Sequence, residues 1–176
     1  MNSNNLNTYR EAVEFYAYSR VNEVLSNAGN DHAIIIFSNI FKTAEKKVLL
    51  LAKNLNNEVT KSSEYRGALR CFLEKKKTKL DVILTNYQLE DSTSPVFDLF
   101  REFGDKVAIK NSNGKGFKMK SSDQDVHFCI GDNRMYRLEY NTTDREARCN
   151  FNDPDFSGKL SGLFYGLFLN VDFITL

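Results

Sequence analysis

Four side chains that can do chemistry fall on one stretch of alternating residues, 126–140. Apolar residues alternate there with His127 and Cys129, and a few positions later with Arg137 and Glu139. Because successive side chains of a strand point to opposite faces, this pattern predicts a hairpin that presents all four on one polar face. A titratable imidazole beside a carboxylate and a guanidinium can bind a phosphate group or act in acid–base catalysis.

The same residues also have a purely structural interpretation. In that interpretation Arg137 and Glu139 form an ordinary ion pair on the sheet surface, and His127 is a hydrogen-bonded neighbour. Both interpretations stay open at this point.

Lysines form a second set of candidates for anion binding. They fall into two groups, Lys75, Lys76, Lys77 and Lys79, and Lys110, Lys115, Lys118 and Lys120. Such lysines usually form a solvated face, but two groups that flank one groove would follow a nucleic-acid backbone. In the second group we expect Lys115 and Lys118 to contact an anion.

The elements that must hold these side chains alternate between helices and short strands. Helical periodicity predicts helices at 8–28, 32–46, 63–77 and 95–103 and from 154 onward. Apolar or alternating runs predict strands at 48–52, 80–84, 107–109, 126–130, 135–140 and 147–151, and loops at 53–63, 88–94, 111–125 and 141–145. The sequence therefore predicts an α/β fold with a mixed β-sheet flanked by helices, in which 48–52 and 80–84 are parallel neighbours.

Length and composition restrict the class of protein. The chain has 176 residues, 41% of them hydrophobic, with 24 Lys+Arg against 23 Asp+Glu. This composition excludes an intrinsically disordered chain, and the length predicts a single domain over 1–176, with the helix of 1–30 packed on it. The charge balance excludes a uniformly basic surface but leaves a local basic patch open.

The cellular location follows from the cysteines and the apolar runs. Cys71, Cys129 and Cys149 have no metal-binding or disulfide spacing, which favours reduced thiols. The first residues are polar, and no apolar run approaches the ~20 residues of a membrane span. We therefore expect a cytoplasmic protein with no transmembrane segment, no metal and no cofactor.

The order of these elements resembles one half of the phospholipase D-like superfamily. A helix, the strand 48–52, a helix with a lysine-rich end, the strand 80–84 and a late strand beginning with His127 follow the arrangement of that family. The resemblance implies an α/β/α sandwich and a motif of His, any residue, Lys, four residues and Asp. In the family the histidine is the nucleophile, and a second copy of the motif supplies the general acid.

The chain departs from that motif at two of its three residues. Cys129 stands in the place of the lysine, Arg134 stands in the place of the aspartate, and Asp132 comes two residues early. Cysteine supplies no cation for a phosphate, and Arg137 or Arg134 would have to replace it. The later segment 147–152, which contains Asn150, resembles the family's strand of small residues and asparagine that follows the motif.

Three functions are compatible with this reading. The first is a non-catalytic phospholipase D-like binding or regulatory module acting on a protein or nucleic-acid partner. The second is a divergent, metal-independent phosphodiesterase or nuclease that works as a homodimer through His127, with Glu139 assisting. The third is a structural subunit of a bacterial defence or mobile-element assembly. In each, Arg134, Arg137 and Asn150 are candidate anion-binding residues.

Overall fold

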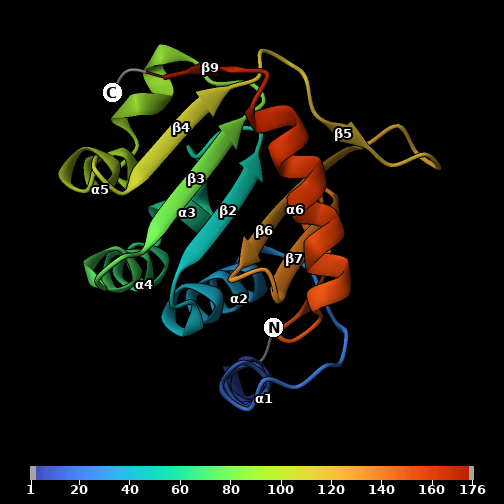
Figure 1. The fold of residues 1–176 in the computed structure, drawn as a ribbon. Helices are drawn as coiled ribbons and strands as arrows, with labels where there is room; N and C mark the ends of the chain where they lie inside the picture. Colours follow the sequence, from blue (N-terminus) through green and yellow to red (C-terminus); the bar gives the residue numbers. More distant parts are fainter. Residues whose placement is uncertain (1–2, 175–176) are drawn as a thin grey trace.

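The computed structural model describes residues 3–174, which form one mixed β-sheet covered by helices on both faces (Figure 1). The strands are β1 (Leu25–Asn27), β2 (Lys47–Ala52), β3 (Lys79–Leu84), β4 (Val107–Asn111), β5 (Phe117–Lys118), β6 (Asp125–Gly131), β7 (Met135–Asn141), β8 (Glu146–Asn150) and β9 (Asp172–Phe173). Their order across the sheet is β1-β8-β7-β6-β2-β3-β4-β9, and β5 pairs with β6 beside this path. The helices are α1 (Ser3–Tyr18), α2 (Asn30–Thr43), α3 (Glu58–Lys61), α4 (Ser63–Glu74), α5 (Val96–Glu102), α6 (Pro154–Phe168) and the 3₁₀ helix η1 (Leu89–Thr93).

The centre of the sheet is β2, which joins a parallel half to an antiparallel half. It pairs in parallel with β3, which pairs in parallel with β4, and it pairs antiparallel with β6. Helix α4 lies in the crossover between β2 and β3, as the strand–helix–strand pattern predicts. Strands β6, β7, β8 and β1 continue the sheet as an antiparallel series.

Two hydrophobic cores lie on the two faces of the sheet. Alternate residues of β2 enter different cores: Val48 and Leu50 face α2 and α4, whereas Leu49 and Leu51 face α6. Because both faces are covered, β2 is apolar along nearly its whole length. The predicted α/β/α sandwich with a mixed sheet is therefore confirmed.

The first predicted helix is too long. Helix α1 ends at Tyr18, and Leu25–Asn27 form the edge strand β1, which pairs with β8. Arg20 adopts a left-handed φ of 53°, and the amide of Val21 donates to the carbonyl of Tyr16 at 3.0 Å. This bond across a left-handed residue is a Schellman-type end, so the helix stops despite the apolar spacing that follows.

Smaller differences occur at the start of α1 and in the predicted loops. Helix α1 includes residues 3–7, which lie before the predicted start of the first helix at residue 8. The predicted loop 53–63 contains α3, where Asn57 and Thr60 form a reciprocal capping box. The predicted loops 88–94 and 111–125 contain η1 and β5. Across residues 3–174, no helix has the length and apolar character needed to cross a membrane.

Candidate functional site

The hairpin of β6 and β7 brings the candidate side chains together. His127 pairs with Glu139 and Cys129 pairs with Arg137 in the register of the two strands, so the predicted arrangement of the four residues is confirmed. This polar face is buried inside the fold. Cys129 is 0% exposed, Arg137 1% and Glu139 4%, because the helices of the larger core cover this side of the hairpin.

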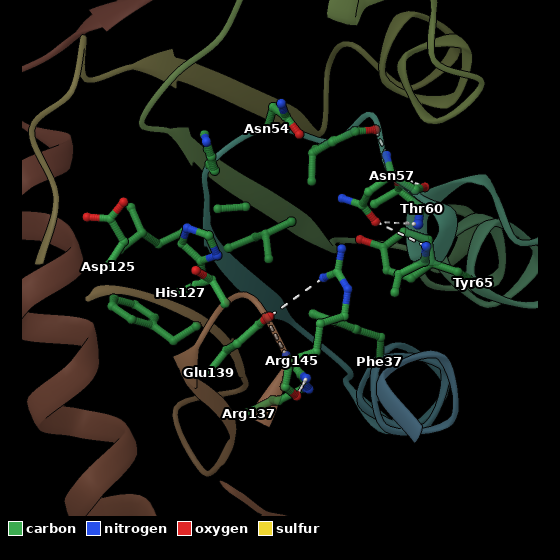
Figure 2. Close-up of a pocket in the computed structure, with 18 of the residues that line it drawn as sticks. Phe37, Asn54, Asn57, Thr60, Tyr65, Asp125, His127, Arg137, Glu139 and Arg145 are labelled. Carbon is green, nitrogen blue, oxygen red and sulfur yellow. Dashed lines mark hydrogen bonds and ion pairs between the residues drawn. The ribbon is translucent and has the colours of Figure 1, made fainter. Parts of the chain in front are cut away.

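A cavity of about 330 Å³ opens at the end of this face, where β2 ends and β6 begins (Figure 2). His127, Arg137 and Glu139 line it from the sheet. The segments that follow β2 and β7 add polar residues to its wall, namely Lys53, Asn54, Asn57, Thr142, Thr143 and Arg145. Phe37 and Tyr65 form an aromatic part of the wall. We refer to this cavity as the pocket.

Arg137 is the most constrained polar group of the pocket. Its guanidinium donates to Glu139 Oε2 at 2.8 Å, to Asn27 Oδ1 at 3.3 Å and to the carbonyl of Arg145 at 3.2 Å. It also lies 5.2 Å from the centre of the Phe37 ring. These contacts hold the cation inside the fold, where it neutralises Glu139.

Glu139 has a second oxygen without a hydrogen-bond partner among residues 3–174. Its Oε1 atom is buried and lies 3.6 Å from the guanidinium of Arg145, whose side chain is 26% exposed. This buried carboxylate oxygen is available to accept a hydrogen bond from a donor group that enters the pocket. Arg145 and Lys53 are the other cations that line the pocket.

The imidazole of His127 faces the same cavity. Its Nε2 atom is buried and has no hydrogen-bond partner in the described part of the chain. Burial lowers the pKa of His127 below its ordinary value of 6.5, and the carboxylates of Glu139 and Asp125 oppose this shift. The imidazole is therefore neutral near pH 7, in the form that serves as a base, a nucleophile or a hydrogen-bonding group.

Cys129 occupies the position where the resemblance expects a lysine. Its thiol is fully buried, and burial raises its pKa to about 12, so it is neutral. Asp132, the acid nearest the expected aspartate, accepts hydrogen bonds from the backbone amides of Glu45, Lys46 and Lys47 at 2.7 to 2.9 Å. Neither residue supplies a charge to the pocket.

Two predicted anion-binding residues lie at the other end of the hairpin. Arg134 follows the turn and donates to the carbonyls of Phe151 and Thr43 at 2.7 and 3.3 Å. Asn150 pairs with Tyr136 in the register, and its amide donates to Asn22 Oδ1 at 2.8 Å. Neither residue lines the pocket, because the hairpin separates this end from His127.

The predicted lysines also lie outside the pocket. Lys118 forms an ion pair with Asp123 at 3.0 Å, and Lys115 is exposed. Gly114 and Gly116, which flank Lys115, line a smaller cavity of about 180 Å³ that shares His127, Asp125 and Lys53 with the pocket.

The pocket residues that sequence reasoning missed lie in the segments after β2 and β7. Lys53, Asn54 and Asn57 fall in the predicted loop 53–63, and Thr142 and Thr143 in the predicted loop 141–145. Their position directly after buried strands was an available signal, because ligands in α/β proteins bind at the carboxyl ends of strands. Within residues 3–174, no group of three or more His, Cys, Asp or Glu side chains is arranged to hold a metal ion.

Comparisons with known proteins give matches in structure only. No protein-family model and no curated protein matches the sequence. TrmBL2, an archaeal chromatin protein whose structure shows a novel mode of DNA binding, matches with a TM-score of 0.62 and 14% identity; the match covers 97% of this chain and 63% of TrmBL2. The chain thus spans less than two thirds of that protein.

Two phospholipase D-type structures match over their whole length. Nuc from Salmonella typhimurium, a phospholipase D family member, has a TM-score of 0.58 and 9% identity, with 88% of this chain and 100% of Nuc covered. NucT from Helicobacter pylori has a TM-score of 0.58 and 13% identity, with 86% and 100% covered. The strand order, the helices on both faces and these matches together show that the chain has a phospholipase D-like fold.

Proposed function

We propose that the chain is a non-catalytic phospholipase D-like binding module that acts on a macromolecular partner. The observation that carries this proposal is the pairing of His127 with Glu139 and of Cys129 with Arg137. It puts a carboxylate beside the imidazole and a neutral thiol where a phosphate-binding cation is needed. The one cation opposite the thiol is held by Glu139, Asn27 and the Arg145 carbonyl.

This arrangement is unsuited to phosphoryl transfer. Such transfer depends on positive charge placed beside the transferred group. Arg137 is already paired with Glu139 instead, so its charge is not available to hold a phosphodiester beside the imidazole. The pocket suits a polar ligand that donates a hydrogen bond to Glu139 Oε1.

Nucleic acid is the partner class that we favour. The support is the likeness in fold to TrmBL2, which is described as a chromatin protein that binds DNA, and to the phospholipase D-type structures. A protein partner is the alternative. Two pull-down experiments distinguish the two partner classes: capture of the chain on an immobilised duplex favours nucleic acid, and capture on an immobilised protein favours a protein partner.

A cleavage assay tests the non-catalytic proposal. The purified chain is incubated with single- and double-stranded DNA, RNA and bis-p-nitrophenyl phosphate, with and without metal ions. We expect no cleavage above that of the buffer. Metal-independent cleavage that is lost in His127→Ala and retained in His32→Ala, the matched variant at the other histidine, would overturn the proposal.

The second candidate function is a phosphodiesterase or nuclease that works as a homodimer. The neutral imidazole of His127, with Nε2 unpartnered and facing the pocket, favours it. This function requires two His127 side chains at one site, so sedimentation must show a dimer and the cleavage rate must fall with dilution below the dimer dissociation constant.

A further inference from the structure

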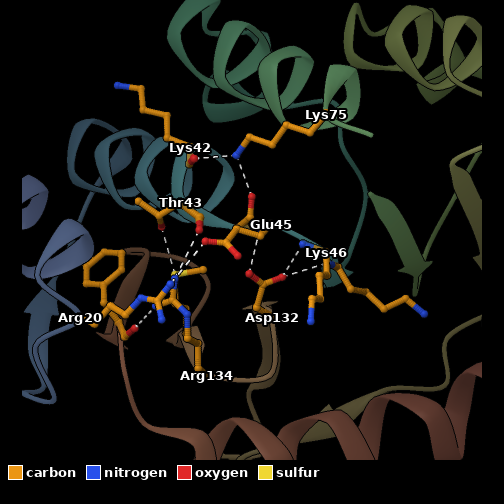
Figure 3. Close-up of polar contacts among 12 residues, drawn as sticks. Arg20, Lys42, Thr43, Glu45, Lys46, Lys75, Asp132 and Arg134 are labelled. Carbon is orange, nitrogen blue, oxygen red and sulfur yellow. Dashed lines mark hydrogen bonds and ion pairs between the residues drawn. The ribbon is translucent and has the colours of Figure 1, made fainter. Parts of the chain in front are cut away.

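Lysines gather at the end of the sheet opposite the pocket. Lys47 and Lys79 begin β2 and β3 and pair with each other, and α2 and α4 end beside them. We define the basic edge as Lys42, Lys46, Lys75, Lys76, Lys77 and Lys79. Contacts join its two segments, because Lys75 Nζ donates to the carbonyls of Lys42 and Ala44 at 2.7 Å each (Figure 3).

The charge of the basic edge is not neutralised by ion pairs. None of its six lysines lies within ion-pair distance of a carboxylate in the described part of the chain. Lys75 and Lys79 bind backbone carbonyls, which carry no net charge, and each ammonium group keeps a donor for another partner.

Two nearby carboxylates are engaged within the fold. Glu45 pairs with Arg20 at 3.4 Å, and Asp132 accepts the three backbone amides at the start of β2 (Figure 3). Glu74 and Asp105 are further acids on the adjoining segments, and Asp81, two residues after Lys79, pairs with Lys47 at 2.8 Å. The lysines outnumber these acids, so the edge is positive although the whole chain has a net charge of +1.

The shape and composition of the edge favour a double-stranded polyanion. Its lysines lie at the ends of α2 and α4, directly before β2 and at the start of β3, and duplex DNA offers a phosphate charge for about every 1.7 Å of its axis. None of the described large apolar side chains that are exposed lies on residues 42–47 or 74–79. Inserted apolar side chains strengthen binding to an anionic membrane, and aromatic rings strengthen binding to a single strand by base stacking, so their absence among these described residues favours a duplex.

We infer that the basic edge binds the phosphate backbone of double-stranded nucleic acid without reading its sequence. The inference takes its partner class from the proposed binding function and names the surface that meets that partner. It places nucleic acid at the end of the sheet where β2 starts, whereas the pocket lies where β2 ends. It also differs from the expectation that the two lysine groups flank one groove, because Lys110 pairs with Ile83 near the far end of β3.

Fluorescence anisotropy with a labelled 20-base-pair duplex tests the inference at several salt concentrations. The test variant is Lys42→Glu/Lys46→Glu/Lys76→Glu, at exposed lysines whose ammonium groups have no contact in the described residues. The matched control is Lys61→Glu/Lys120→Glu/Lys159→Glu, which changes the net charge equally at exposed lysines elsewhere. Thermal unfolding followed by circular dichroism confirms that both variants fold.

We expect the unaltered chain to bind duplexes of unrelated sequence about equally and the control to bind within a few-fold of it. The test variant is expected to lose at least about tenfold in affinity, and its slope of log affinity against log salt to fall by about 3. No duplex binding, equal loss in both variants, or tighter binding to anionic vesicles or to single strands would overturn the inference. Cleavage activity would contradict the proposed function and leave this comparison unaffected.

Discussion

The chemistry of the pocket depends on the protonation of His127. Burial disfavours the imidazolium, so the pKa of His127 is lower in the folded chain than in the unfolded chain. Near pH 7 both states are neutral at this residue. As the pH falls below about 6.5, the unfolded chain takes up a proton that the folded chain resists, and the free energy of unfolding decreases.

We therefore predict that His127 makes the free energy of unfolding smaller at pH 5.5 than at pH 7.5. Urea unfolding at the two pH values measures this effect. A His127→Gln variant should lose that part of the pH dependence, whereas His32→Gln should keep it. An unchanged pH dependence in His127→Gln would contradict the prediction.

The cysteines should differ sharply in reactivity. Cys71 is exposed, whereas Cys129 and Cys149 are fully buried, and burial raises the pKa of both thiols to about 12. Because the thiolate is the reactive form, we predict one fast thiol per folded chain with a colorimetric thiol reagent and three after denaturation. Cys71→Ser should have no fast thiol, and a second fast thiol in the unaltered chain would contradict the buried positions.

At the scale of elements, the side chain of Arg137 connects three segments of the chain by hydrogen bonds. It lies on β7 and contacts Asn27 of β1 and the carbonyl of Arg145 in the segment before β8. Removing one partner of a buried ion pair leaves the other charge unpaired, which costs more than removing both. The pocket is therefore sensitive to a change at one of the two charges.

We predict that Arg137→Leu lowers the free energy of unfolding by about 3–5 kcal/mol, because Glu139 loses its buried partner. The double variant Arg137→Leu/Glu139→Leu should lose less than the single variant. Chemical denaturation measures both, and a double variant less stable than the single one would refute this account of the pair.

At the scale of the whole molecule, we expect the local stability of the strands to be greatest at the centre of the sheet and to decrease toward its edges. Strands β2 and β3 have neighbours on both sides, whereas β9 and β5 each pair at only two positions. We predict that hydrogen exchange is slowest for the amides of β2 and β3 and fastest for those of β5 and β9. Mass spectrometry of peptides after exchange measures this order, and fast exchange in β2 would contradict it.

The sequence predicts those features of the fold that depend on local residue patterns, such as strands and the side chains that share a face. The apolar run at 48–52 indicates a strand covered on both faces, and the alternation around His127 and Glu139 indicates which side chains share a face. Burial of that face could not be predicted, because Arg137 and Glu139 are polar residues that satisfy each other inside a core. The loops that supply Lys53 and Thr142 have no periodicity, so their place around the pocket is set by the elements that they connect.

Strand β1 shows why the rest depends on distant contacts. Residues Leu25–Asn27 contain no alternating pattern, and they form a strand because β8 lies beside them. Asn27 then accepts a hydrogen bond from Arg137 and donates one to the carbonyl of Ala147. The position of Arg137, which lines the pocket, thus depends on a residue 110 positions earlier in the chain.

This connection also sets an order of assembly. A ribosome makes β1 long before β8, and closing so large a loop is entropically costly until the intervening strands have paired. The guanidinium of Arg137 therefore acquires its Asn27 contact only after the antiparallel half of the sheet has formed. We therefore expect the pocket to be completed late in folding, although β1 precedes the other described strands in the chain.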